Sequence, residues 1–188
     1  METSSLTTCA NPGCNQPGTN QCSACKTTPY CGPICQTANW THHKEECPGH
    51  LLKVGLINLE KACNFHNAYN WPQALRCSEL AAKKLKQMKD CPVEVIDKVL
   101  SFKFNSLNMI GRYKEALECA KEWYCLHLTK HTHPPAITAG FALIESCIKN
   151  GEYFDAVVYA RTAWETIMLS RDSHIPDNER ESFTAEGA

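Results

Sequence analysis

Eight potential metal ligands crowd a short stretch near the N-terminus and constrain the fold more than any other feature. Seven of the chain's 13 cysteines lie in it, together with one histidine, at the spacing C-x4-C-x7-C-x2-C-x5-C-x3-C-x7-H-x3-C. The residues are Cys9, Cys14, Cys22, Cys25, Cys31, Cys35, His43 and Cys47. Four such ligands complete one tetrahedral zinc site, so eight predict two structural zinc ions with no open coordination position.

Residues 1–48 are rich in Gly, Pro, Asn, Thr and Cys and poor in Leu, Ile and Val. Such a stretch cannot bury enough apolar surface to fold unaided, and zinc binding would supply the missing folding free energy. The odd number of cysteines and the polar character of residues 1–8, which do not resemble a signal peptide, favour metal thiolates over disulfides. We therefore expect an intracellular protein, cytoplasmic or nuclear.

The local pattern predicts a short hairpin over residues 21–31 and a helix over residues 33–46. In that helix His43 and Cys47 would lie one turn apart on the same face. The spacing alone leaves open whether the ligand pairs bind zinc in sequence order or interleave. It also leaves His42 as a possible competitor for His43.

The stretch CSACKTTPYCGPICQTANWTHHKEEC, residues 22–47, resembles a MYND-type zinc finger. Tyr30 before the fifth ligand and Trp40 three residues before the histidine are part of the likeness, whereas the first pair is C-x4-C where C-x2-C is more usual. The resemblance implies interleaved pairs. Cys9, Cys14, Cys31 and Cys35 would hold one zinc ion, and Cys22, Cys25, His43 and Cys47 the other.

The same resemblance implies a peptide-docking role. In the corepressor-binding members of the family, the groove residues match Ser23, Gln36 and Trp40 of this sequence. An aromatic ring stacks well on a polyproline-type ligand, and polar side chains hold the ligand's backbone. The alternative is that Trp40 packs only against the core of its own module.

From residue 49 onward the chain shows helical periodicity and an internal repeat. Three segments align on Ala74, Ala116 and Ala156, at intervals of 42 and 40 residues, which is typical of a stacked helical repeat. Each unit predicts a pair of antiparallel helices, and Pro92 and Pro134 stand where the second and third pairs would begin.

The Gly-x-Tyr-x-x-Ala-Leu core of these units resembles the tetratricopeptide repeat (TPR). The period exceeds the 34 residues of that family, and Phe104 and Ile144 replace a small residue, so the units are TPR-like. We expect a mainly α fold, with a cross-braced finger over 1–48 and TPR-like helix pairs over 49–188, incomplete at the C-terminus. An ordinary helical bundle is the alternative.

Several further residues carry weaker predictions. The apolar face of the first helix in the third pair is expected to comprise Ile137, Phe141, Ile144 and Ile148. His127, His131 and His133 are expected in a loop or near a helix C-terminus. The six cysteines outside the finger are expected to be small buried residues. Residues 176–179 form a helix start signal close to the last residue, which suggests a fragment or shortened product of a longer repeat protein.

Charge and hydropathy exclude several classes of function. The net charge is −1, and residues 1–48 contain two lysines, no arginine and three acidic residues, so the phosphate-binding term of nucleic-acid affinity is nearly absent. No apolar run approaches the ~18 residues of a membrane span.

We therefore expect a non-enzymatic adaptor without a small-molecule substrate, which binds protein partners, including proline-rich segments, and no nucleic acid or membrane. The alternative is a fragment or relative of a SET-and-MYND lysine methyltransferase that lacks the strand-rich catalytic domain.

Overall fold

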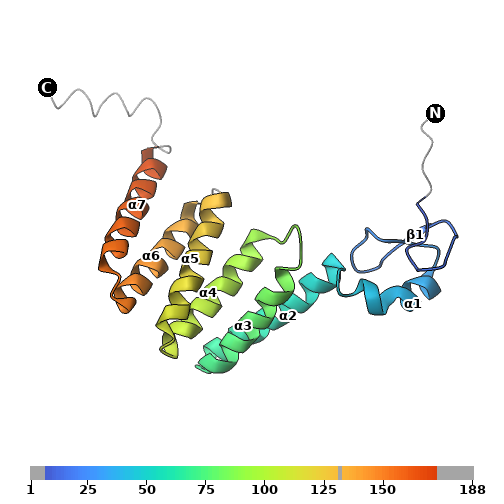
Figure 1. The fold of residues 1–188 in the computed structure, drawn as a ribbon, viewed down its shortest axis with the longest axis horizontal. Coiled ribbons are helices and arrows are strands. Elements are labelled where there is room, and N and C mark those ends of the chain that lie inside the picture. Colours follow the sequence, from blue (N-terminus) through green and yellow to red (C-terminus); the bar gives the residue numbers. More distant parts are fainter. Residues whose placement is uncertain (1–6, 131–132, 173–188) are drawn as a thin grey trace.

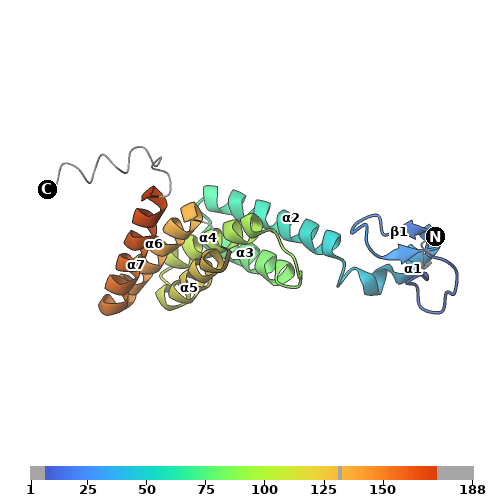
Figure 2. The same ribbon diagram turned by 90° about the horizontal axis from the view of Figure 1, so that it is seen from above.

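The computed structural model describes residues 7–130 and 133–172, without the side chains of residues 129–136 and 166–172. In these ranges a small finger at the N-terminal end is followed by a row of stacked helices (Figure 1). Seen from above, α2 extends from the finger into the stack (Figure 2). The helices are α1 Pro33–His43, α2 Pro48–Asn67, α3 Trp71–Leu85, α4 Val93–Met109, α5 Tyr113–Lys130, α6 His133–Asn150 and α7 Tyr153–Asp172. The mainly α fold class is confirmed.

None of the described helices is both long enough and apolar enough to cross a membrane.

The finger is built on a minimal antiparallel hairpin. Strand β1, Asn20–Gln21, pairs with β2, Pro29–Tyr30, and an isolated bridge joins Thr8 to Pro17. The buried Tyr30 hydroxyl accepts a hydrogen bond from Asn39 Nδ2 at 3.1 Å. This bond ties the hairpin to helix α1.

Helix α1 ends at His43, three residues before the predicted end. Residues 44–46 form a turn, and Cys47 has extended backbone angles of φ −70° and ψ 110°. The cause is Pro48, whose ring disfavours the helical conformation in the preceding residue. His43 and Cys47 therefore flank a turn, and Cys47 stands directly before the first residue of α2.

The three predicted pairs correspond to α2–α3, α4–α5 and α6–α7, and each helix packs against the next one in the chain, within these pairs and between them. Gly111 and Gly151 follow the first helix of the second and third pairs with φ of +79° and +78°, the conformation that glycine adopts without strain at a helix end. The three alanines on which the units align are all buried.

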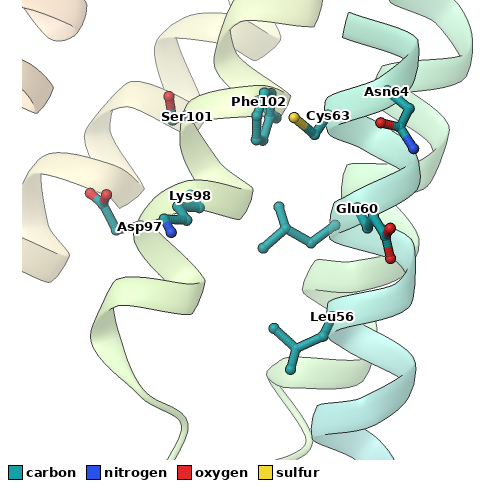
Figure 3. Close-up of a pocket in the computed structure, with 9 residues that line it drawn as sticks. Leu56, Glu60, Cys63, Asn64, Asp97, Lys98, Ser101 and Phe102 are labelled. Atoms are coloured by element: carbon teal, nitrogen blue, oxygen red, sulfur yellow. The ribbon is translucent and has the colours of Figure 1, made fainter. Parts of the chain in front are cut away.

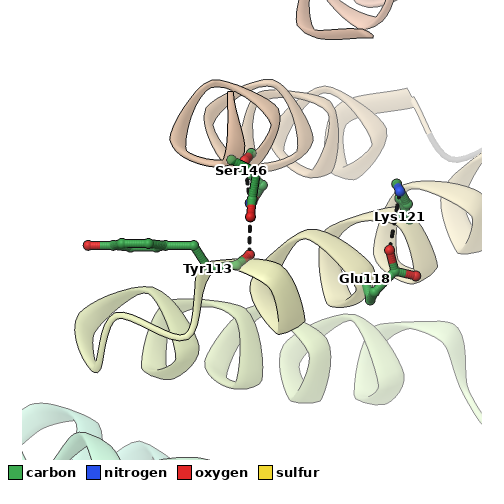
Figure 4. Close-up of polar contacts among 5 residues, drawn as sticks. Tyr113, Glu118, Lys121 and Ser146 are labelled. Carbon is green, nitrogen blue, oxygen red and sulfur yellow. Dashed lines mark hydrogen bonds and ion pairs between the residues drawn. The ribbon is translucent and has the colours of Figure 1, made fainter. Parts of the chain in front are cut away.

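The helical core is continuous across the pairs. Leu100, Phe104, Leu107, Leu117 and Leu143 belong to one buried cluster formed largely by α4, α5 and α6. At one end of α6, Asn150 Nδ2 donates to the carbonyl oxygens of Tyr113, at 3.0 Å, and Ser146, at 2.8 Å (Figure 4). These bonds fix the end of α6 against the start of α5.

The predicted apolar face of α6 was only partly right: Ile144 packs against the core cluster, but two of the four predicted residues do not face inward. Phe141 and Ile148 are exposed, whereas Ala139, Ala142 and Cys147 are buried. Small residues at a crossing let two helices approach closely, so α6 presents its small residues to its neighbours and turns two large ones outward.

The weaker predictions had mixed outcomes. His127 lies in the last turn of α5, near the helix C-terminus as expected, but it is fully buried beside Asp97 and not in a loop; His131 and the side chain of His133 lie outside the described residues. Cys77, Cys119 and Cys147 are buried as expected, but Cys63 and Cys91 are half-buried and Cys125 is exposed. The predicted helix start at 176–179 also lies outside the described residues.

Candidate metal centre and its surface

The eight predicted ligands gather into two clusters. One contains Cys9, Cys14, Cys31 and Cys35, and the other contains Cys22, Cys25, His43 and Cys47. Within each cluster the four ligand atoms lie within 4.8 Å of one another. The hairpin and α1 bring together pairs that are distant in sequence, so the clusters interleave rather than follow chain order.

The spacing of the ligand atoms fits a tetrahedral zinc ion. With zinc–sulfur bonds of about 2.3 Å, the sulfur atoms of a tetrahedral site are about 3.8 Å apart. The Sγ atoms of Cys14 and Cys31 are 3.7 Å apart, those of Cys31 and Cys35 are 3.4 Å apart, and Cys25 Sγ lies 3.5 Å from His43 Nε2. Two Cys/His clusters therefore fit two zinc ions.

Two ligand thiols of the same cluster have widely different pKa values in the absence of a metal ion. Burial tends to raise the pKa of Cys25, but hydrogen bonds from Thr27 and Thr28 outweigh it and lower the pKa to about 5. In the same cluster, burial and the nearby Cys25 raise the pKa of Cys47 to about 11. Zinc binds cysteine as the thiolate, so a cation between Cys25 and Cys47 would favour the deprotonated form of Cys47.

The all-cysteine cluster shows the same contrast. The pKa of Cys9 is lowered to about 7, because hydrogen bonds from the backbone of Asn11 and Cys31 outweigh the effect of burial. The pKa of Cys31 is raised to about 12, mainly by its hydrogen bond to Cys35.

Both sites are closed sets of four protein ligands. A catalytic zinc site keeps a position open for water or substrate, and neither cluster leaves one. The donor sets suit ions that fold the module rather than ions that activate water.

The three predicted docking residues lie on one side of the finger. Gln36 Nε2 donates to Ser23 Oγ at 3.1 Å, which links α1 to the loop between Cys22 and Cys25. Trp40 follows Gln36 by one helical turn. Its ring is half-buried and makes edge contacts with the rings of His43 and His50, at centroid distances of 6.0 and 5.2 Å. Trp40 thus supports the module's core and still presents part of its ring to solvent.

The finger joins the helical body without a linker. His50, which contacts Trp40, belongs to the first turn of α2. A methyl group on Gly49 would lie 2.1 Å from the carbonyl oxygen of Ala24, so α2 begins in close contact with the metal-binding loop. Lys84 of α3 also pairs with Glu45 of the turn at 3.3 Å.

A groove between α2 and α4 was not found from the sequence. Its volume is about 510 Å³ (Figure 3). The lining residues are Leu56, Leu59, Glu60, Cys63, Asn64, Asp97, Lys98, Ser101 and Phe102. They come from two helices about 40 residues apart, so no local motif could have revealed them.

A polar cluster at the edge of this groove, centred on the half-buried Asp97, was also missed. Asp97 Oδ1 accepts a hydrogen bond from Trp123 Nε1 at 2.7 Å and lies 2.6 Å from His127 Nε2. The only sequence signal was the i, i+4 spacing of Trp123 and His127, which fixes their common face but not their partner.

Comparisons with known proteins agree on the finger. Residues 9–47 match the model of the MYND finger family. Over 39 residues the chain is 46% identical to the "Deformed epidermal autoregulatory factor 1" of Drosophila melanogaster, a stretch that covers 21% of this chain and 6% of that relative. No solved structure matches the chain significantly. The finger, a zinc-binding protein-interaction module, is thus supported independently of its geometry.

Proposed function

We propose that this chain is a non-catalytic adaptor whose finger docks short extended peptide segments, including proline-rich ones, on Ser23, Gln36 and Trp40. The observation that carries the proposal is the rigid mounting of these residues. The Gln36–Ser23 hydrogen bond and the edge contacts of Trp40 fix their side chains beside two closed metal clusters. A docking surface fixed in advance loses little conformational entropy on binding.

The polar and aromatic parts of this surface have separate tasks. The exposed side of the Trp40 ring offers a flat apolar surface for a proline ring or an extended side chain. The Ser23 hydroxyl and the Gln36 amide offer donors and acceptors to the backbone of the peptide. The eight clustered ligands hold the metal ions in this proposal and take no part in recognition.

The helical body supports a second role as a scaffold of TPR-like pairs. The groove between α2 and α4 has an apolar wall in Leu56, Leu59 and Phe102 and charged edges in Glu60 and Lys98. A second weak site on the same molecule would raise the effective concentration of a joint partner.

No feature of the described residues supports a catalytic function of the SET type. The strands in the described residues are the two-residue β1 and β2 of the finger, whereas a SET domain is rich in strands. We therefore propose protein partners for this chain in the cytoplasm or nucleus, and neither methyl transfer nor nucleic-acid binding.

The test is a titration of fluorescent proline-rich peptides into the 188-residue chain. We expect saturable binding that Trp40→Ala abolishes while two zinc ions per chain remain bound. Trp164→Ala, which removes an exposed tryptophan of α7, is the matched control and should leave this binding intact. Binding that survives Trp40→Ala would refute the assignment of the groove.

A further inference from the structure

The aromatic part of the docking surface is in contact with a residue from outside the finger. Among the described residues, the ring closest to that of Trp40 belongs to His50, with centroids 5.2 Å apart and planes at 81°. The ring of the metal ligand His43 is farther away, at 6.0 Å. His50 lies in the first turn of α2, whereas the match to the MYND finger family ends at residue 47. The closest ring contact of the docking tryptophan therefore comes from the helical body.

A second contact from the same turn of α2 reaches the loop that carries Ser23. A methyl group on Gly49 would lie 2.1 Å from the carbonyl oxygen of Ala24 and 2.5 Å from its carbonyl carbon, so the two backbones pass without room for a side chain. Ala24 directly follows Ser23, whose hydroxyl accepts the hydrogen bond from Gln36. Two adjacent residues of α2 thus lie against the aromatic and the polar parts of the docking surface.

This turn of α2 is fixed by the helices behind it. Leu51, the residue after His50, is fully buried. One turn further along, a methyl group on Gly55 would lie 2.5 Å from Cδ2 of Leu85, so α2 packs closely on α3. The place of His50 beside the finger is therefore set by the packing of the first helix pair.

We propose that His50 is a positioning residue of the docking surface, and that the first turn of α2 holds Trp40 and the Ser23 loop in the arrangement that binds peptide. This role of His50 rests on the docking function proposed for the finger. Peptide binding then belongs to the finger and the first helix pair together, and its affinity depends on a part of the chain that the family match does not include.

Removal of the His50 ring would change the free protein first. Trp40 lies in the last turn of α1 and is half-buried, so without the neighbouring ring its side chain would sample more rotamers. A peptide would have to order this side chain on binding, which lowers affinity. We expect the loss to be about three- to tenfold, the range that ordering one large side chain produces.

The contact acts through the ring and not through its nitrogen atoms. Among the described residues, the His50 ring makes an edge contact with Trp40 and no hydrogen bond. Phenylalanine keeps a flat ring of similar size without the nitrogen atoms. His50→Phe should therefore retain the positioning role, and His50→Ala should lose it.

His66 offers a matched control in the same helix. Its ring makes the same kind of edge contact with Trp71, with centroids 4.8 Å apart and planes at 81°. His66 stands at the other end of α2, about 24 Å along the helix axis at a rise of about 1.5 Å per residue. His66→Ala thus removes a histidine–tryptophan contact far from the docking surface.

The first measurement is peptide affinity. A fluorescent proline-rich peptide is titrated with the zinc-loaded 188-residue chain, as wild type, His50→Ala, His50→Phe and His66→Ala, and followed by anisotropy. We expect His50→Ala to bind about three- to tenfold more weakly, and the other two variants to bind within about twofold of the wild type. Zinc analysis and circular dichroism should show two zinc ions per chain and unchanged helix content in every variant.

The second measurement is made on the free protein. Fluorine-labelled tryptophan gives one NMR resonance for each of the chain's four tryptophans, and Trp40→Ala identifies the resonance of Trp40. We expect His50→Ala to shift and broaden this resonance, because the ring loses its neighbour. His50→Phe should keep it sharp, and His66→Ala should instead shift the resonance of Trp71.

The two measurements separate failure of this role from failure of the docking function. A wild-type protein that binds none of the peptides would refute the docking function, and the role of His50 with it. Where the wild type binds, unchanged affinity in His50→Ala would overturn only the role of His50. The same holds for His50→Phe if it binds as weakly as His50→Ala.

Two further outcomes would assign His50 a different role and overturn this one. Weaker binding with an unchanged Trp40 resonance would mean that His50 contacts the peptide and does not position Trp40. Loss of zinc from His50→Ala would mean that the residue acts through the metal centre.

Discussion

The finger and the helical body use the same residue type for opposite purposes. In the finger, cysteine is an ionisable ligand whose pKa depends on its polar neighbours: hydrogen bonds from Thr27 and Thr28 lower the pKa of Cys25 to about 5, and the hydrogen bond to Cys35 raises that of Cys31 to about 12. In the helices, cysteine is a small apolar residue, and burial raises the pKa of Cys119 to about 12. Cysteine chemistry is therefore set by polar neighbours and clustering rather than by the number of cysteines in the chain.

The two regions also differ in what holds them together. In the described part of the finger, Tyr30 is the one fully buried large apolar side chain apart from the ligands. The helical body buries its apolar side chains in two clusters, one between α2, α3 and α4 and a larger one that extends from α3 to α7. The finger thus depends on its metal ions, and the helices depend on their apolar contacts.

Loss of the metal ions should affect the folding of the finger and of the helices most differently. Structural zinc contributes about 10–16 kcal/mol of apparent binding free energy in small finger modules. We expect Cys22→Ser, or a strong chelator, to unfold the finger and its 11-residue helix α1 while the other helices persist. Circular dichroism and zinc analysis would measure both effects. Cys63→Ser, the same change in α2, should leave the zinc content at two. Loss of all helical signal on chelation would contradict the independence of the two regions.

The pH dependence of zinc affinity should follow from the raised thiol pKa values. Cys31, with a pKa of about 12, and Cys47, with a pKa of about 11, are protonated at pH 7 without metal, so each cluster must release at least one proton on binding. The apparent affinity should then fall about tenfold per released proton for each unit of pH lost between 8 and 7. Calorimetry in buffers of different ionisation enthalpy would count the protons. A zinc affinity independent of pH would contradict the assignment of these thiols as ligands.

Local sequence predicted most of the helices and the eight metal ligands, and the family resemblance implied how the ligands divide between two clusters. Metal-ligand spacing is a short-range property, and Pro92, Gly111 and Gly151 mark helix boundaries through their own backbone restrictions. The spacing did not decide between sequential and interleaved pairs. That choice depends on the hairpin, which carries Cys31 and Cys35 to the side of Cys9 and Cys14.

Most of what the sequence did not predict depends on distant residues, although the first case is local. The end of α1 depends on Pro48, whose effect on Cys47 competes with the helical pattern of the preceding residues. The partner of His127 is Asp97, 30 residues earlier, and the groove between α2 and α4 combines residues from two repeats. Periodicity identified apolar residues in α6 but gave the inner face to the large ones, because it carries no information on how closely two helices cross.

A cavity in the helical core should affect the helices and spare the finger. Leu107 is fully buried in the cluster of α4, α5 and α6. We expect Leu107→Ala to reduce the free energy of unfolding of the helical body by about 2–5 kcal/mol, from lost burial and the cavity left behind. Urea denaturation would measure it. Met109→Ala, at an exposed position of the same helix, should change little. Release of zinc from the folded Leu107→Ala variant would show that the regions are more strongly coupled than their separate cores imply.

Substitution of Gly49 tests the contact between the finger and the helices, and we expect its effect on stability to be the smallest of the four. A methyl group there would lie 2.1 Å from the carbonyl oxygen of Ala24 and 3.0 Å from the backbone nitrogen of Cys25, and backbone atoms cannot move away as a side chain does. We expect Gly49→Ala to cost about 1–3 kcal/mol of stability through this overpacking. It should also weaken zinc binding at the cluster of Cys22 and Cys25 more than at the other cluster, because the displaced loop carries these two ligands. Competition with a chromophoric chelator would resolve the two sites. Gly32→Ala is the control, since Gly32 has an extended backbone and open space around it. Equal effects of the two substitutions would mean that α2 does not hold the loop in place, and the finger would then be joined to the helices by chain connectivity alone.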